Sequence, residues 1–434
     1  MGAGRWRSFA VLLGLIVVGA FALRVTYTVF GTTRPDNRLY DWEYYRGEAK
    51  ALADGDGFVQ PGYAGIPANR AKPAADHPPL FVVVLAPVSW LTHDNDLALR
   101  LVNCVLGTLG VALIGLLGRS VAGERVGVVA ALIAAVYPNL WVNDGLIMAE
   151  SLAVVIVTAT LLLAVRVIRG PTWGNVVALA FLCALGALTR AELALLFPLV
   201  CLPAIIVGTR GALLRPAGLV VASVAVVALT VGPWVAYNMS RFRKPVLVST
   251  NFDLNLLMTN CPDTFHGPLL GSSGLCSLWR TPSGRDESVV AVKERSEALT
   301  YLRANLSAYP VAVLARIGRT FSLYKPLDDP KYGVFEGRPK WVTDLGLIAY
   351  YPLLVLAAWA VRVRRRARAL LWPLLVPFGI VLISMLVSYG QVRYRVSCEP
   401  VIVVLGAIGL VAITRGRTAT DAVSAPEPVT TSPR

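Results

Sequence analysis

Acidic and aromatic side chains lie next to one another in the segment Arg38-Leu-Tyr-Asp-Trp-Glu-Tyr-Tyr45, just after the first apolar run. A carboxylate at a membrane surface can accept a proton from a hydroxyl group or bind a divalent cation. Asp41 is the first candidate for this chemistry, and Glu43 is the second. A lone loop acid is usually a solvated surface residue, but here three aromatic neighbours could stack on a sugar or join an interfacial belt: Trp42, Tyr44 and Tyr45.

A further acid, Glu150, opens a later apolar run in Asn143-Asp-Gly-Leu-Ile-Met-Ala-Glu150. An acid that faces a helical bundle at the mouth of a span is costly unless it is paired or hydrated, so Glu150 is a functional candidate. Asp144, in the preceding connection, is expected to be a loop residue or a helix cap.

Basic side chains at the ends of other apolar runs could bind an anion. A guanidinium binds phosphate bidentately, so Arg190, Arg393 and Arg395 suit a lipid phosphate at headgroup depth. The alternatives are contacts with ordinary phospholipid headgroups or, for Arg190, a structural pair with Glu192. Arg24, near the end of the first run, is expected only to extend to the headgroups.

Other kinds of chemistry have weaker support. The chain has three histidines, which are scattered and do not predict a zinc site: His77, His93 and His266. No Walker A motif or paired nucleotide fingerprint occurs, so the sequence does not favour an ATP-driven mechanism. Asp41, Glu43 and Glu150 could supply oxygen ligands to a divalent cation, a point that the sequence leaves open. Cys261 and Cys276 share a polar loop, and a disulfide there depends on whether that loop faces an oxidising compartment.

The composition predicts the elements that must position these residues. The chain of 434 residues is 56% hydrophobic and 15% charged, whereas about a quarter of the residues of a soluble domain are charged. Recurring apolar runs therefore predict an all-α polytopic membrane protein with about ten transmembrane helices. The net charge of +15 comes from arginines in short connections, which favours cytoplasmic loops over nucleic-acid binding. The predicted spans are 8–28, 98–118, 125–142, 149–167, 174–189, 191–207, 216–237, 343–361, 369–388 and 397–414.

The short apolar segment Pro79–Leu91 decides the topology. If this segment does not cross the membrane, the arginine-rich ends of the other spans all fall on one side, whereas a crossing would break this bias. We therefore predict a re-entrant or interfacial helix, with both termini cytoplasmic. The chain then divides into a transmembrane core, 1–237, which includes a first extracytoplasmic loop, 29–97. A long extracytoplasmic loop, 238–342, and the last helices, 343–414, follow it. The tail, 415–434, is expected to be disordered in the cytoplasm.

The order of the motifs resembles that of the GT-C glycosyltransferases, in the branch of protein O-mannosyltransferases and the lipid A aminoarabinose transferase. The resemblance covers residues 8–414: an outer acid–aromatic motif, then Ala-x-x-Leu-x-x-Gly-x-Gly-Phe, Pro-Pro-Leu, a second outer acid, and Arg-Tyr-Arg before the last span. It implies that Asp41 is the catalytic base, Glu150 is the second acid, and His77 occupies a basic position before Pro-Pro-Leu. Glu43 stands one place later than the family's Glu.

The resemblance implies inverting transfer of a sugar from a polyprenyl-phosphate donor to an extracytoplasmic protein, lipid or cell-wall glycan. Arg393, Arg395 and Arg190 would stabilise the departing phosphate. We expect the plasma (inner) membrane of a bacterium, with a role in the cell envelope. The main alternatives are a non-catalytic lipid or solute transporter and a lipid-binding membrane protein. Transporters usually place their charges near the bilayer midplane, whereas here the charges gather at the outer boundary.

Overall fold

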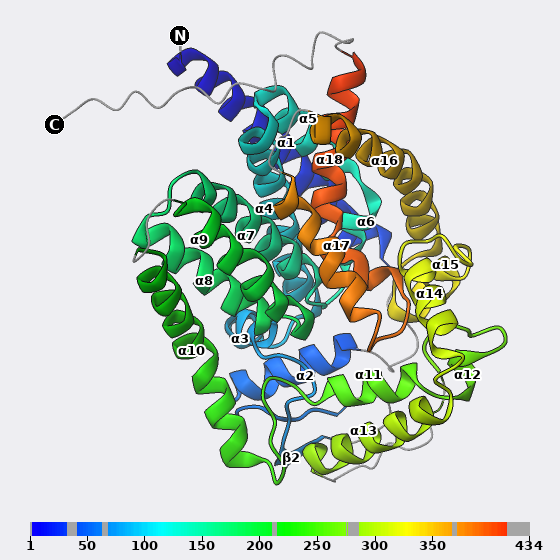
Figure 1. Cartoon of the computed structure of the whole chain (residues 1–434). Helices are drawn as coiled ribbons and strands as arrows, with labels where there is room; N and C mark the ends of the chain where they lie inside the picture. Colours follow the sequence, from blue (N-terminus) through cyan, green and yellow to red (C-terminus); the bar gives the residue numbers. More distant parts are fainter. Residues whose placement is uncertain are drawn as a thin grey trace.

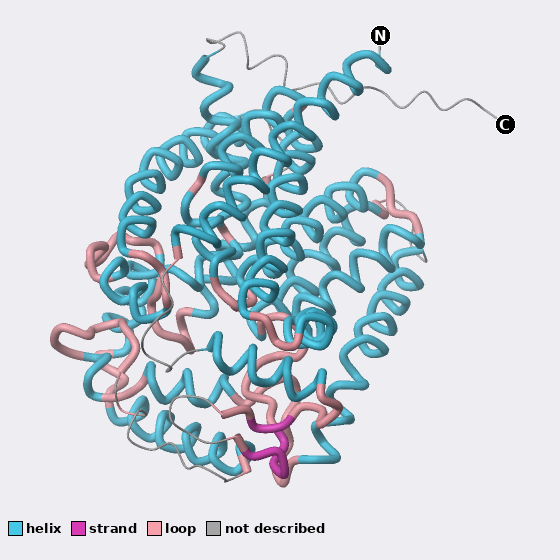
Figure 2. Tube along the Cα trace, turned by 180° about the vertical axis from the view of Figure 1, so that it is seen from behind, coloured by secondary structure: helices cyan, strands magenta, loops and turns pink. Residues whose placement is uncertain are grey.

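The computed structural model describes residues 2–32, 41–62, 68–210, 215–274, 276, 286–366 and 371–414, so the expectation for the tail 415–434 lies outside it. Those residues form an almost wholly helical fold (Figures 1 and 2). Their only sheet pairs β1 (Val59–Gln60) with β2 (Asn69–Pro73) in antiparallel order. The expected all-α polytopic architecture is confirmed.

The apolar runs form a bundle of helices. Its members are α1 (Gly2–Thr26), α4 (Asp96–Ala122), α5 (Glu124–Val136), α7 (Glu150–Arg169), α8 (Trp173–Ala187), α9 (Leu202–Gly208), α10 (Arg215–Arg241), α16 (Lys340–Arg366), α17 (Trp372–Ser384) and α18 (Glu399–Thr414). Within the described chain, six helical segments are long and apolar enough to cross a membrane, or seven if a bent pair over Glu124–Gly145 counts as one span. Three of the ten predicted spans coincide with the shorter helices α8, α17 and α18, so the count of ten stays a prediction.

Small residues allow the central helices to pack closely. Gly115 and Gly118 of α4 face α5, where an added side chain would meet Ala130, Ala131 or Gly127. Close backbone approach at small residues is a common way to associate helices within a membrane, where the hydrophobic effect between them is absent. Helix α18 lies at the centre and packs against α5, α16 and α4.

Two charged residues that we expected at the edges are instead paired inside the bundle. Arg24 is 0% exposed, and its Nε lies 2.8 Å from Oδ2 of Asp144. Ser151 donates a hydrogen bond of 2.6 Å to the other oxygen of Asp144. The prediction that Arg24 extends to the headgroups is therefore wrong, because Asp144 gives the guanidinium an internal partner. Asp144, which we expected to be a loop residue or a helix cap, lies in the short turn Val142–Gly145 and is completely buried.

Short helices cover one end of the bundle. They are α2 (Asp41–Ala53), α3 (Leu80–Thr92), α11 (Asn251–Thr259), α12 (Pro262–Phe265), α13 (Glu287–Ala304), α14 (Tyr309–Thr320) and α15 (Asp329–Gly333). Figure 1 shows α2, α11 and α13 at the end opposite to the start of α1 and the end of α18. Helix α3 has 13 residues, about 20 Å, and packs against α2 and α4. Its short length agrees with the re-entrant prediction, which remains a prediction.

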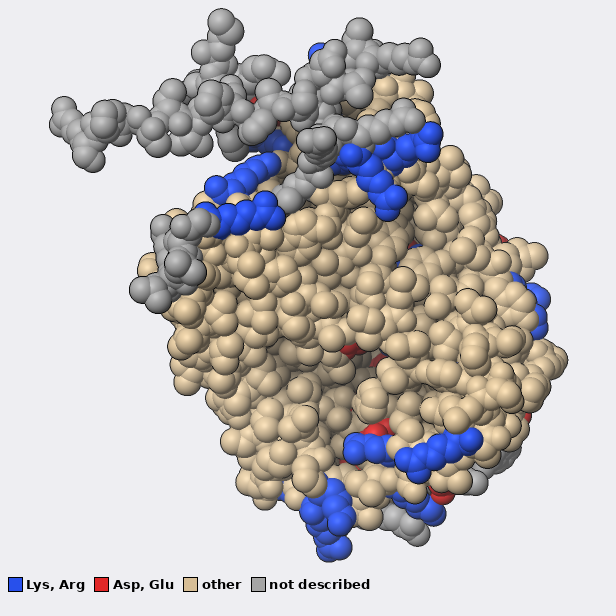
Figure 3. Space-filling model, viewed as in Figure 1, with Lys and Arg blue, Asp and Glu red and all other residues tan. Residues whose placement is uncertain are grey.

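The arginine-rich helix ends meet at the other end of the bundle. Arg169, at the end of α7, donates to Oγ of Ser120 (3.3 Å), and Arg364 of α16 donates to the carbonyl of Val121 (3.5 Å). Helix α7 spans 20 residues from Glu150 to Arg169, about 30 Å, which matches the hydrocarbon thickness of a bilayer. Figure 3 shows Lys and Arg at both ends of the molecule with a mostly uncharged face between them.

Candidate active site

Asp41 lies at the start of α2, where unpaired backbone N–H groups favour a negative charge. The buried face of α2 carries Tyr44, Tyr45 and Glu48 and packs against α3. This leaves the Asp41 side chain 29% exposed, so a ligand can reach it. Glu43 lies in the same turn as Asp41 and is half-buried, and residues two apart on a helix point in different directions.

Arg393 connects Asp41 to two other acids. It belongs to η6 (Val392–Ser397), and its Nη2 donates to Oδ2 of Asp41 at 2.6 Å. Its Nη1 donates to Glu336 at 3.0 Å, and its Nε lies 3.2 Å from Glu150. One guanidinium therefore holds three carboxylates that are distant in sequence, as charge-assisted contacts allow. The sequence named Asp41, Glu150 and Arg393, and the structure brings all three together.

Two more arginines surround Glu150, which is 1% exposed. Arg190 donates to Glu150 at 3.2 Å and to Glu192 at 2.6 Å, so the structural pair with Glu192 and a place beside Glu150 both occur. Arg338 lies 4.0 Å from Glu150 and also pairs with Glu336. A buried acid without such partners would be costly. The arginines therefore allow Glu150 to remain charged.

Sequence inspection missed Arg338 and Glu336. Both lie in the long loop, around η5 (Val334–Glu336), in a stretch without periodicity or a motif. Their positions follow from contacts with Arg393 and with Asn143, whose Oδ1 accepts from Arg338 at 3.2 Å. The opposite charges of Glu336 and Arg338, two residues apart, were the one sequence feature that could have indicated a site here, and this feature is weak.

His77 lies between aromatic rings and acids. Its ring stacks on Tyr45 at 4.7 Å between centroids and meets the edge of Tyr44 at 5.0 Å. Nε2 lies 3.7 Å from Oδ1 of Asp41 and 3.5 Å from Oδ2 of Asp76. The structure thus places His77 beside the candidate base, next to Oδ1 of Asp41, whereas Arg393 contacts Oδ2.

The expected sugar-stacking role does not suit two of the three aromatic residues. Tyr44 and Tyr45 are 2% and 5% exposed and pack against His77, so their faces are unavailable to a ligand. The reason is that α2 turns these two positions inward against α3. Trp42 is half-buried and remains a candidate for contact with a sugar.

Arg395 lies apart from the cluster around Arg393. It is 1% exposed, donates to Glu399 at 2.7 Å, and lies over the ring of Tyr350 at 3.7 Å. In a 3₁₀ helix, residues two apart lie on different sides because the helix has three residues per turn. The prediction that Arg395 joins Arg393 in a phosphate site is therefore not supported, and we leave Arg395 out of that site.

The ionisation of Asp41 depends on these neighbours. Burial works to raise the pKa of Asp41, but the charge of Arg393 and the hydrogen bond and charge of His77 outweigh it and hold the pKa well below its usual range. Burial also opposes the charge of Arg393, yet Asp41 and Glu150 raise the pKa of the guanidinium further. At neutral pH the two side chains are thus an ion pair.

The acids do not form a cation site in the described residues. Asp41, Glu43 and Glu150 do not bring three ligating atoms within 4.8 Å of one another, and the described group that does so is Cys261, Asp263 and Cys276. In that group the two sulfurs are joined in a disulfide, so they cannot act as thiolate ligands. Arginines neutralise Asp41 and Glu150 instead, and these residues do not fit a divalent cation.

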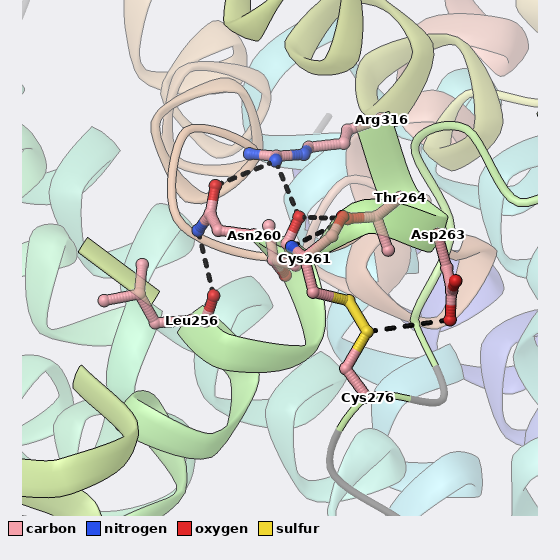
Figure 4. Close-up of a disulfide and its surroundings, with 8 residues drawn as sticks. Leu256, Asn260, Cys261, Asp263, Thr264, Cys276 and Arg316 are labelled. Atoms are coloured by element: carbon pink, nitrogen blue, oxygen red, sulfur yellow. Dashed lines mark hydrogen bonds between the residues drawn. A yellow bond between two sulfur atoms is a disulfide. The ribbon is translucent and has the colours of Figure 1, made fainter. Parts of the chain in front are cut away.

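The disulfide lies in the long loop and joins Cys261, just before α12, to Cys276. Figure 4 shows Cys261 bonded to Cys276, with Asp263 close by and Arg316 held against Asn260. From the same loop, the carbonyl of Gly271 accepts a hydrogen bond of 2.8 Å from the backbone of Gly390, three residues before Arg393. The cross-linked loop therefore supports the segment that carries Arg393.

Comparison with known proteins agrees with this architecture. Residues 76–237 match the family model described as dolichyl-phosphate-mannose-protein mannosyltransferase, which is less than half of the chain. No curated protein matches the sequence. The fold is similar to that of the Archaeoglobus fulgidus oligosaccharyltransferase in its apo form, with a TM-score of 0.54 and 15% identity over 94% of this chain and 50% of that chain.

Further solved structures are similar as well. The complex of the oligosaccharyltransferase AglB from Archaeoglobus fulgidus with an inhibitory peptide and a dolichol-phosphate has a TM-score of 0.52 and 15% identity, covering 96% of this chain and 52% of that chain. ArnT from Cupriavidus metallidurans, bound to undecaprenyl phosphate, has a TM-score of 0.41 and 15% identity, covering 94% and 78%. The chain spans about half the length of the archaeal enzyme. Part of the chain therefore matches a mannosyltransferase family model, and the fold is similar to that of the archaeal enzyme.

Proposed function

We propose that this protein is a glycosyltransferase that moves a sugar from a polyprenyl-phosphate donor to an extracytoplasmic acceptor, a protein, lipid or glycan, with inversion at the anomeric carbon. The observation that carries the proposal is the contact of a ligand-accessible Asp41 with Arg393, in the same cluster as Glu150 and Arg190. A base and a group of cations at the end of a transmembrane bundle suit a donor whose tail lies in lipid and whose sugar lies outside it.

In the proposed reaction, Asp41 accepts the proton of an acceptor hydroxyl while that oxygen attacks the anomeric carbon. The new bond forms as the bond between the anomeric carbon and the phosphate oxygen breaks, and the lipid phosphate leaves with the electron pair. The proton remains on the Asp41 carboxyl until it passes to solvent. A base held by Arg393 is ionised at neutral pH and fixed in direction, which favours a near-attack geometry.

The leaving phosphate gains negative charge that the arginines can stabilise. Arg393, Arg190 and Arg338 all lie around Glu150. Nε and Nη1 of Arg190 are engaged by acids, while no described residue accepts from its Nη2, which can therefore contact a phosphate oxygen. Figure 3 also shows a hollow in the uncharged face with acidic atoms in it, a suitable approach for a donor from the bilayer.

We further propose that the site faces the extracytoplasmic side and that both termini are cytoplasmic. The arginine-rich ends of α4, α7 and α16 lie at the end of α7 away from Glu150, and the positive-inside trend assigns them to the cytoplasm. The loops 29–97 and 238–342 then form the outer cover. A cysteine introduced at the exposed residue Ala68 should react with an impermeant maleimide added to intact cells. Labelling only after the cells are opened would reverse the orientation.

The activity can be tested with purified protein, a polyprenyl-phosphate hexose or pentose, and candidate acceptors. Asp41→Asn should lower turnover by about 10²- to 10⁴-fold, because a general base typically contributes that much. Asp54→Asn is the matched control: this acid is exposed at the other end of α2 and pairs with Lys50. Equal turnover by wild type and Asp41→Asn would reject Asp41 as the base. Donor binding without turnover by the wild type would favour a lipid-binding or transport protein.

A further inference from the structure

His77, Asp76 and Asn251 form a contact network behind the candidate base. Asn251 begins α11, in the long loop, whereas Asp76 and His77 precede α3 in the first loop. Nδ2 of Asn251 lies 3.2 Å from Oδ2 of Asp76 and 3.2 Å from Nδ1 of His77. The backbone N–H of Asn251 also donates to the carbonyl of Asp76 at 3.2 Å, so the two loops are fixed to each other here.

These contacts determine which ring nitrogen of His77 carries the hydrogen. A carboxylate oxygen of Asp76 accepts hydrogen bonds, so the Asn251 atom beside it must be the NH₂ group. The same NH₂ group faces Nδ1 of His77, which must then be an acceptor without a hydrogen. In the neutral ring the hydrogen therefore lies on Nε2, which faces Oδ1 of Asp41 and Oδ2 of Asp76.

We propose that His77 is a positioning residue for Asp41: Asn251 keeps Nδ1 of the neutral ring an acceptor, so that the Nε2–H group faces the Asp41 carboxylate. The inference rests on the proposed function for the role of Asp41, although the tautomer itself does not. Nε2 lies 3.7 Å from Asp41 and 3.5 Å from Asp76, so it faces both carboxylates without a short hydrogen bond to either. Arg393 then holds one oxygen of Asp41, and His77 faces the other.

This assignment differs from a phosphate-binding role for His77. The ring is enclosed by Tyr44 and Tyr45 and is 9% exposed, and its polar atoms face Asp41, Asp76 and Asn251. The charged groups that act on it are those two acids and Arg393. Burial opposes protonation, but Asp76 and Asp41 outweigh it and raise the pKa of His77, while Arg393 works against them. A second proton would enter at Nδ1 and displace the Asn251 amide.

The tautomer can be measured without any substrate, so its test is independent of the proposed activity. With three histidines in the chain, ¹⁵N-histidine labelling gives few signals, and His93→Asn and His266→Gln assign those outside the site. We expect a proton on Nε2 and none on Nδ1 of His77 at pH 9, and the cation at lower pH. Asn251→Asp places an acceptor at Nδ1 and should move the hydrogen to Nδ1 or retain the cation at pH 9. An Nδ1–H tautomer in the wild type would overturn the proposal.

The role in positioning is tested by three substitutions at His77, assayed with the polyprenyl-phosphate donor over a range of pH. His77→Gln retains an N–H near the Nε2 position and should keep kcat within about tenfold of wild type, whereas His77→Phe retains only the stacking and should fall further. His77→Lys keeps a positive charge also above the pKa of His77, and such a charge lowers the pKa of a neighbouring acid and weakens it as a base. It should therefore lower kcat with little change in the donor KM. Wild-type kcat in His77→Lys, together with a raised donor KM in His77→Gln, would instead identify His77 as a phosphate-binding cation.

Discussion

Arg393 is the residue whose removal should reveal most about the proposed site. Its guanidinium holds Asp41, Glu150 and Glu336 at distances of 2.6, 3.2 and 3.0 Å. Arg393→Gln would leave three acids with one fewer cation between them. Removing one partner of a buried ion pair commonly costs about 3–5 kcal/mol of stability, and the 12% exposure of Arg393 places the expected loss toward the lower figure.

The same substitution should also lower catalysis. Removing a group that stabilises developing negative charge typically costs about 10²- to 10³-fold in kcat. The pKa of Asp41 should rise toward its ordinary value, because burial would then act without its main opposing charge. The acidic limb of the pH–rate profile should accordingly move to higher pH.

A second substitution distinguishes the effect of Arg393→Gln on stability from its effect on catalysis. Glu336→Gln removes one of the acids, so Arg393→Gln/Glu336→Gln should regain part of the thermal stability without regaining kcat. The measurements are the unfolding temperature in detergent and the turnover at saturating donor. Arg46→Gln is the matched control, since Arg46 of α2 pairs with Asp94 and not with the acids around Arg393. If Arg393→Gln unfolds at the wild-type temperature and keeps kcat within about tenfold, the proposed site is wrong.

Three further predictions concern the rest of the fold. Burial and Asp76 raise the pKa of Glu287 to about 8, so its contribution to stability is complete below its ordinary pKa and is lost as pH rises toward 8. The unfolding temperature of Glu287→Gln should therefore fall less than that of the wild type between pH 5 and 9. Parallel curves for the two proteins would contradict this prediction. Replacing Cys261 and Cys276 by serine opens a loop of 15 residues and should cost about 3 kcal/mol, measured by denaturation with and without reductant, whereas equal stabilities would exclude the cross-link. Arg24→Leu should destabilise the protein by about 3–5 kcal/mol, because it leaves the buried charge of Asp144 unpaired. The double variant Arg24→Leu/Asp144→Leu removes both charges and should be destabilised much less. Additive losses of stability in the double variant would refute the pairing.

The sequence predicted the helices and the ends at which chemistry should lie. Apolar runs of sufficient length form helices in a membrane because the backbone must satisfy its own hydrogen bonds there. Asp41 and Glu150 were recognisable because each acid stands at the boundary of such a run, and each begins a helix in the structure. These are local properties, so they can be recognised in the amino-acid sequence.

The partners of those acids were less accessible to sequence inspection. Asp41 and Arg393 are 352 residues apart, and Glu336 and Arg338 stand in a loop without a recognisable pattern. Arg393 and Arg395 look equivalent in sequence, yet the 3₁₀ turn directs one toward Asp41 and the other toward Glu399. Spacing alone could not distinguish them, because their directions depend on the local backbone.

The amino-acid sequence alone thus predicted the class of fold, the motif order that resembles GT-C enzymes, and Asp41 as the candidate base. The packing of distant segments shows that Tyr44 and Tyr45 are packing residues, that Arg24 and Asp144 form an internal pair, and that His77 faces Asp41. These differences follow from the range of the interactions. Hydrophobic periodicity is a property of one helix, whereas a buried charge pairs with a residue from a distant element that the packing brings within about 4 Å.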